Sequence, residues 1–382
     1  MGTSFDSTRL VSFSRRYVVG IFKILALLTI FALVGWIMKI LTNPMGLHDS
    51  YAYLLVAQSP FELTAPPFGY RIAIPYLAAF LSASLHMNLE RTFEVLQIGL
   101  YSLVLTSWYL WATLGLKLTK PTSVMTSILF IFSYPGVYNL HNAVHVGFGE
   151  HLFLLLGFMA IFHNSYWLLY IIIIISCFVK ENVGVLLIPT FAVNNLYYEK
   201  LRLTFVRTVA LSATFLVISV LLRTGVFFKS GLLVQYTSMY TNWAFIKYCY
   251  NYNGEYDMIL LSIGATFGVT WLLALVGFIV APNRMRVLLI LPVLATIMTV
   301  WAAGGTARMV GLGFPVILAF SGLALDRMHK TLAGMIVITN AAFFLCVNHQ
   351  THNPIEIGLL GIAVLILYVA RFSWGMVSSE HC

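Results

Sequence analysis

The amino-acid sequence predicts an all-α protein, a polytopic transmembrane bundle of about 12 helices. Of its 382 residues, 60% are hydrophobic and only 9% are charged, against roughly 25% charged residues in an ordinary soluble domain. The hydrophobic residues gather in runs of about 17–25, the length that crosses the hydrocarbon layer as a helix. So few charged side chains do not cover a soluble globule of this size, which argues against soluble enzymes, nucleic-acid-binding modules and disordered proteins.

The first apolar run, 17–42, is predicted to be a membrane helix with a cytoplasmic N-terminus. Arg9, Arg15 and Arg16 precede it, and it is too long for a signal-peptide core and lacks a small-residue cleavage pattern. The net charge of +9 comes from basic residues between apolar runs. Such residues set topology and face anionic lipid, so membrane lipids are expected partners and nucleic acid is not.

Eleven further runs have spanning length, and an even total of helices keeps both termini in the cytoplasm. The runs are 70–88, 94–117, 122–140, 147–163, 165–197, 204–224, 258–281, 286–303, 309–325, 331–348 and 355–374. The basic connections Glu199–Arg207, Arg284–Arg286 and Asp326–Lys330 then lie inside, as the positive-inside rule expects, but Lys117 and Lys120 would lie outside. Lys180-Glu181-Asn182 interrupts 165–197, which is either one broken helix or two short ones.

Two connections, 43–69 and 225–257, are too long for simple turns and are expected on the extracytoplasmic side. Long loops of this kind often carry function. No linker marks a separable soluble part, so residues 1–382 are predicted to form a single membrane domain. The four cysteines lack metal-ligand spacing and are interpreted as small buried hydrophobic residues.

The first long loop holds two candidate positions. Asp49, after His48, follows the end of the first helix, where a partly desolvated carboxylate can act as a base. A solvated loop residue or a helix N-cap is the alternative. Tyr70-Arg71 precedes the next apolar run, and an arginine there suits bidentate contacts to phosphate. The alternative is a membrane-anchoring arginine beside an interfacial tyrosine.

Several ionisable residues interrupt or border the later apolar runs. Such groups are costly in hydrocarbon and are usually functional or paired. Without a His-Glu-x-x-His pattern, the histidines do not indicate a metalloprotease. No resident cofactor is expected, although a divalent metal held by Asp49 and a histidine stays an option. The residues concerned are His141, His145, Glu150, His151, Lys180, Glu181 and Arg308.

An acidic residue just after the first helix, followed by Tyr-Arg-Ile-x-x-Pro at 70–75, resembles the GT-C superfamily of polytopic glycosyltransferases. The chain looks closest to its bacterial, mannosyltransferase-like members. Lys180-Glu181-Asn182 and the turn at Arg308 are similar to features of that family too. The resemblance covers a GT-C-like core, 17–325, and leaves 326–382 as additional C-terminal membrane helices.

The resemblance implies a cell-envelope transferase that moves a sugar from a polyprenyl-phosphate donor to a glycan, lipid or protein acceptor at the extracytoplasmic face. It implies Asp49 as general base or metal ligand and Arg71, Lys180 or Arg308 as partners of the leaving phosphate. His48, Tyr70 and Glu181 are expected to contact substrate, with Glu150, His151 and His145 as further candidates. A single acid replaces the pair seen in some members, which puts metal dependence in doubt. A bacterial inner membrane is expected in preference to the endoplasmic reticulum.

Other functions fit the same residues. A transporter or flippase of a lipid-linked or anionic substrate predicts broken helices and buried charges near the bilayer midplane, and the interruption at Lys180 fits it. An acyltransferase or a sugar polymerase or ligase would use His145 or His151. A non-catalytic scaffold predicts no convergence of charged residues.

Overall fold

The computed structural model describes residues 7–42, 50–59, 71–141, 144–199, 201–223, 263–301, 306–348, 362–364 and 366. Within these ranges the elements of regular secondary structure are all helices, joined by turns and short irregular segments. Among the described residues, four helices are long and apolar enough to cross a membrane, as expected for an integral membrane protein. They are Val19–Leu41, Leu89–Leu114, Leu201–Leu222 and Lys330–Asn348. Most of the two long loops and of the run 355–374 lies outside the described residues.

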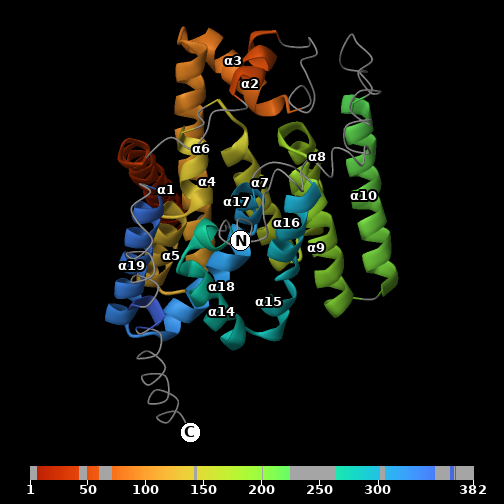
Figure 1. Cartoon of the computed structure of the whole chain (residues 1–382). Helices are drawn as coiled ribbons and strands as arrows, with labels where there is room; N and C mark the ends of the chain where they lie inside the picture. The colour runs from red at the N-terminus through yellow and green to blue at the C-terminus, as the bar shows by residue number, and fades with distance from the viewer. Residues whose placement is uncertain are drawn as a thin grey trace.

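The first four helices form one side of the bundle (Figure 1). α1 (Ser7–Leu41) packs along α4 (Leu89–Leu114), while α2 (Ser50–Gln58) and α3 (Ala73–Leu85) pair at one end of the molecule. α3 has 13 residues and is therefore about 20 Å long, less than the roughly 30 Å of hydrocarbon. The predicted spanning run 70–88 is thus too short a helix to cross a bilayer alone.

The following helices run to and fro between the two ends of the bundle. They are α5 (Lys120–Ile131), α6 (Tyr134–His141), α7 (Gly147–Phe162), α8 (Tyr166–Val179), α9 (Asn182–Tyr198) and α10 (Leu201–Arg223). The open question about 165–197 has a clear answer, because α8 and α9 are separate helices that pack against each other. The helical path is interrupted at Lys180, whose backbone is extended (φ −169°, ψ 129°).

The C-terminal helices complete the bundle. They are α14 (Thr270–Val280), α15 (Asn283–Val287), α16 (Ile290–Trp301), α17 (Thr306–Gly311), α18 (Phe314–Arg327) and α19 (Lys330–Asn348). Aromatic side chains fill the space between them and the earlier helices; Phe130 of α5 and Phe314 of α18, for example, have ring centroids 4.9 Å apart. The outward sides of α1 and α10 stay apolar and exposed, with Ile40 at 70% and Phe205 at 65%, as lipid-facing surfaces would be.

The short connections that meet at one end of the bundle carry many cations, and we call this the basic end. Its cations are Lys117, Lys120, Arg202, Arg207, Arg284, Arg286, Arg327 and Lys330. The backbone N–H of Thr119 donates to Asp326 Oδ1 at 3.1 Å, which joins the α4–α5 connection to the end of α18. Trp111 Nε1 bonds His163 Nε2 at 3.1 Å, and Arg284 donates to the carbonyl of Phe162 at 2.7 Å.

The expected position of Lys117 and Lys120, on the opposite face from Asp326–Lys330, is therefore wrong. The physical reason is that α3 is a short helix paired with α2, so that α4 begins beside the end of α1 and runs back toward the basic end. With this direction all the described basic connections share one end, as the positive-inside rule prefers.

Candidate functional site

Four charged side chains from distant segments meet inside the bundle, at a distance from the basic end. Arg71 precedes α3, Glu150 lies in the first turn of α7, and Lys180 and Glu181 occupy the break between α8 and α9. We call these four residues, with Tyr53 and Asn182, the buried charge network. α7 has 16 residues and is about 24 Å long, so Glu150 is separated from the basic end by most of that length.

Arg71 and Glu181 form a bidentate pair. Arg71 Nε donates to Glu181 Oε2 at 3.1 Å, and Nη2 donates to Oε1 at 2.8 Å. The remaining terminal nitrogen, Nη1, donates to the hydroxyl of Tyr53 at 3.0 Å. Tyr53 is fully buried on α2, and Arg71 is only 7% exposed. Because all three nitrogens of the guanidinium donate hydrogen bonds, its orientation is fixed more firmly than that of an exposed arginine.

Lys180 and Glu150 form the second pair of the network. Lys180 Nζ donates to Glu150 Oε2, and the two side chains are 1% and 2% exposed. Asn182 Nδ2 donates to the other carboxylate oxygen at 3.1 Å. Glu150 also lies in the first turn of α7, where the helix dipole favours a negative charge. Both oxygens of this carboxylate are therefore satisfied without water.

The two candidate histidines border the network and have different surroundings. His145 Nδ1 accepts a hydrogen bond from the backbone N–H of Gly147 at 3.0 Å, and its ring stands edge-on to Tyr53 at 5.4 Å. His151 is enclosed by phenylalanine rings, including Phe148 at 5.8 Å and Phe314 at 5.4 Å. Within the described structure, His151 Nδ1 is buried without a hydrogen-bond partner.

Arg308 lies in α17, which packs against α6 and α16. Its charge interacts electrostatically with Glu150 and Lys180, which places it near the buried charge network. Two guanidinium groups and one ammonium group thus gather around two carboxylates. Cationic groups held in this way in a low-dielectric interior are suited to stabilise a phosphate.

The structure brings Arg71, Glu150, Lys180 and Glu181 into direct contact in pairs and sets His145, His151 and Arg308 around them. Asp49, His48 and Tyr70 lie outside the described residues. Within the part of the chain that the structure describes, no three His, Cys, Asp or Glu side chains are grouped as metal ligands.

Two members of the network, Tyr53 and Asn182, were not expected as site residues. For Asn182 there was a signal, since it adjoins the charged pair that interrupts an apolar run. Tyr53 gives no local signal, because its partner Arg71 is 18 residues away in the sequence.

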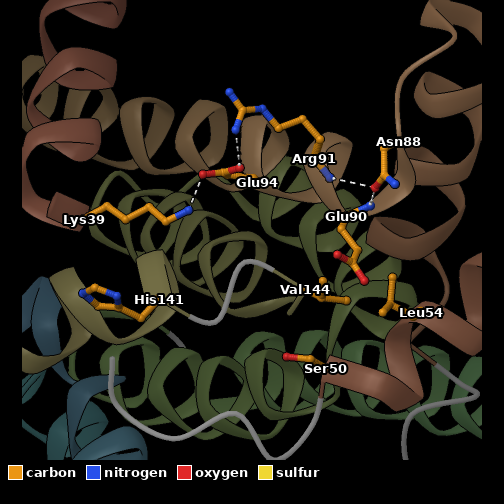
Figure 2. Close-up of a pocket in the computed structure, with 9 residues that line it drawn as sticks. All are labelled: Lys39, Ser50, Leu54, Asn88, Glu90, Arg91, Glu94, His141 and Val144. Carbon is orange, nitrogen blue, oxygen red and sulfur yellow. Dashed lines mark hydrogen bonds and ion pairs between the residues drawn. The ribbon is translucent and has the colours of Figure 1, made fainter. Parts of the chain in front are cut away.

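A cavity of about 490 Å³ lies between the end of α1, the start of α2, the start of α4 and the end of α6 (Figure 2). Glu94 bridges two cations there, because Lys39 Nζ donates to Oε1 and Arg91 Nη1 donates to Oε2, the latter at 3.2 Å. The cavity is lined by Lys39, Ser50, Leu54, Asn88, Glu90, Arg91, Glu94, His141 and Val144. None of these residues belongs to the buried charge network.

The chain matches no protein-family model and no curated protein sequence. The described residues hold two candidate functional features, the buried charge network and the cavity beside the end of α1 and the start of α4.

Proposed function

We propose that the chain is a GT-C-like membrane glycosyltransferase that moves a sugar from a polyprenyl-phosphate donor to an acceptor at the extracytoplasmic face. The observation that carries the proposal is the gathering of Arg71 and Lys180, with Arg308 nearby, inside an apolar helical bundle. Residues that the sequence resemblance assigns to the leaving phosphate come from separate segments, yet they lie together.

The chemistry of sugar transfer fits these groups. Displacing a phosphate at an anomeric carbon requires a base at the acceptor hydroxyl and positive charge at the leaving oxygen. In the proposal Asp49 is the base, while Arg71 and Lys180 stabilise the phosphate. Glu181 and Glu150 hold these two cations in position, so little reorganisation is needed when the anion develops.

The distribution of charge supports the proposed side of the membrane. Cytoplasmic loops carry an excess of lysine and arginine, and the described connections concentrate these residues at the basic end. The network lies toward the opposite end and would then be nearer the extracytoplasmic face. A polyprenyl tail would lie in the bilayer against an apolar outer side of the bundle.

Transport of a lipid-linked or anionic substrate is the second candidate. The observation that favours it is the nearly complete burial of Lys180 and Glu150 at the break between the apolar helices α8 and α9, since broken helices with buried charges are typical of transporter binding sites. The two functions differ in the role of Asp49, which a transporter does not need as a base.

Replacing Asp49 with asparagine separates the two functions. For a glycosyltransferase, Asp49→Asn should lower transfer by about 10²–10⁴-fold, the usual contribution of a general base. The measurement is analysis of lipid-linked glycans in cells that carry the variant, together with flux of the lipid-linked substrate in reconstituted vesicles. Asp326→Asn, an acid at the basic end, is the matched control and should retain transfer. Unchanged glycans from a correctly inserted Asp49→Asn protein would remove Asp49 as the base.

A further inference from the structure

The charges that line the cavity in Figure 2 are balanced. Lys39 and Arg91 are both paired with Glu94, and Glu90 adds a second carboxylate. A ligand with a full charge of either sign would therefore meet a like charge in the lining. Burial and the charge of Lys39 lower the pKa of His141, which disfavours a further positive charge in the lining. These features favour a ligand without net charge.

The lining also offers both apolar contact and hydrogen bonds of both kinds. Leu54 and Val144 supply apolar surface, and Val144 is buried. Glu90 can accept hydrogen bonds, and Lys39 can donate them. Asn88 can donate from Nδ2, while its Oδ1 caps α4 by accepting from the backbone N–H groups of Glu90 and Arg91. A sugar ring has the matching properties, because its C–H face is apolar and its hydroxyls donate and accept. The volume of about 490 Å³ falls within the usual range of small-molecule sites.

The cavity and the buried charge network share a wall. Leu54 lines the cavity, while the hydroxyl oxygen of the preceding residue, Tyr53, accepts the hydrogen bond from Arg71 in the network. Val144 lines the cavity, while the next residue, His145, packs its ring against Tyr53. A molecule in the cavity would thus lie beside the cations without contacting them.

We propose that this cavity binds a neutral, polyhydroxylated ring, namely a saccharide acceptor whose hydroxyl receives the transferred sugar. The identification as acceptor rests on the proposed function, whereas binding of an uncharged sugar rests on the lining alone. Glu90 is the carboxylate that accepts hydrogen bonds from the ligand hydroxyls, and Lys39 donates to them from the opposite side of the cavity, as their places in Figure 2 allow.

The test is saturation-transfer NMR on the full chain in lipid nanodiscs. The neutral probes are methyl α-D-glucopyranoside, methyl α-D-mannopyranoside and myo-inositol, and the charged probes are glucose 6-phosphate and mannose 6-phosphate. We expect at least one neutral probe to bind and the phosphates to bind more weakly. Glu90→Gln should weaken binding of the neutral probe about tenfold, since a hydrogen bond to a charged group becomes a weaker bond to a neutral one. Glu199→Gln, the matched control at the basic end, should not change binding.

Three results would overturn the assignment: no neutral probe binds, Glu90→Gln leaves binding unchanged, or the sugar phosphates bind more tightly. The outcome is independent of the transferase test. If a neutral probe binds and Asp49→Asn leaves the glycans unchanged, the cavity stands as a sugar site and the transferase proposal fails. If Asp49→Asn abolishes transfer and no neutral probe binds, the transferase proposal stands and the cavity assignment fails.

Discussion

The two ends of the bundle use the same chemical pair, a lysine and a carboxylate, in opposite environments. In the buried charge network, Lys180 and Glu150 are 1% and 2% exposed and Asn182 completes the coordination of the carboxylate. At the basic end, Lys330 and Asp326 are 43% and 27% exposed, with 3.5 Å between Nζ and Oδ1. Burial, more than the identity of the residues, separates the two pairs.

This difference indicates different roles. An exposed pair four residues apart on the chain contributes only about 0.3–0.5 kcal/mol, so stability alone gives little reason to keep it. Its cation instead adds to the positive charge that orients the protein in the membrane. Removing two charges from water costs several kcal/mol for each ion, and a buried pair repays this only with good geometry. We infer that the Lys180–Glu150 pair has a functional role beyond its contribution to stability, as ionisable groups inside membrane bundles usually have.

The largest expected effect concerns the sidedness of the two ends. In a background without the native cysteines, Ser84→Cys in α3 and Lys120→Cys at the start of α5 introduce exposed thiols at opposite ends. A membrane-impermeant maleimide added to intact cells should label the cysteine at 84 and leave the one at 120 unlabelled until the membrane is opened. Labelling of both from the same side would break the comparison, because the two ends would then face the same compartment.

The next effect is the loss of one partner of the buried pair. Lys180→Met leaves the Glu150 carboxylate buried without its ion-pair partner, which should lower the free energy of unfolding by about 3–5 kcal/mol. Thermal unfolding in nanodiscs measures the change. The matched control, Lys330→Met, should cost about 0.5 kcal/mol or less, because the lost pair is exposed.

A double variant sharpens the same point. In Lys180→Met with Glu150→Leu both charges of this pair are removed and neither is left buried without its partner, so part of the lost stability should return. Equal stabilities of Lys180→Met and Lys330→Met would show that burial does not distinguish the two pairs.

A smaller effect is expected where the charge is kept and only the geometry changes. Arg71→Lys retains the positive charge but loses the two-point contact to Glu181 and the bond to Tyr53. We expect a loss of about 1.5–3 kcal/mol of stability, the range for hydrogen bonds to charged groups. Thermal unfolding checks this value, and Arg286→Lys at the basic end serves as the control. A loss no greater than that of the control would show that the paired geometry is unimportant.

The sequence predicted the helical class because hydrophobic runs of spanning length are a local property of the chain. It did not predict the direction of α4, because that direction depends on whether the preceding run, 70–88, crosses the membrane. The structure ends α3 at Leu85, where His86 takes a left-handed conformation (φ 52°) and closes the helix. Hydropathy does not register such a stop, so one misassigned run inverted the expected positions of Lys117 and Lys120.

Several site residues could be predicted from the sequence more reliably than the topology, because an unpaired charge in an apolar run is energetically costly. A charge within an apolar run must find a partner, and so Lys180, Glu181 and Glu150 were noticed from the sequence. The sequence did not predict the pairing of these residues, because Arg71 and Glu181 are 110 residues apart and Lys180 and Glu150 are 30 residues apart. The cavity was missed altogether, since its lining comes from the ends of several helices and contains no motif.

The smallest expected effect is a pH dependence at the basic end. Burial raises the pKa of Asp326, but hydrogen bonds from Thr122 and Thr119, with the charge of Lys330, outweigh it and hold the pKa below its usual value. A carboxylate whose pKa is lowered by folding stabilises the folded state above its unfolded pKa of about 3.9, and this contribution is lost as the pH falls through the folded value. Asp326→Asn should therefore lower the free energy of unfolding by about 1 kcal/mol or less at pH 7 and by progressively less below pH 4, measured by thermal unfolding across this range.

Thr122→Val, which removes the hydrogen bond of 2.7 Å to Asp326, should move the pH at which the parent protein loses this stability to a higher value. The free energies of unfolding of Asp326→Asn and the parent could instead differ by the same amount at all pH values. That result would mean that the charge of Asp326 does not contribute to stability, in contrast to the charges expected to act in the buried network.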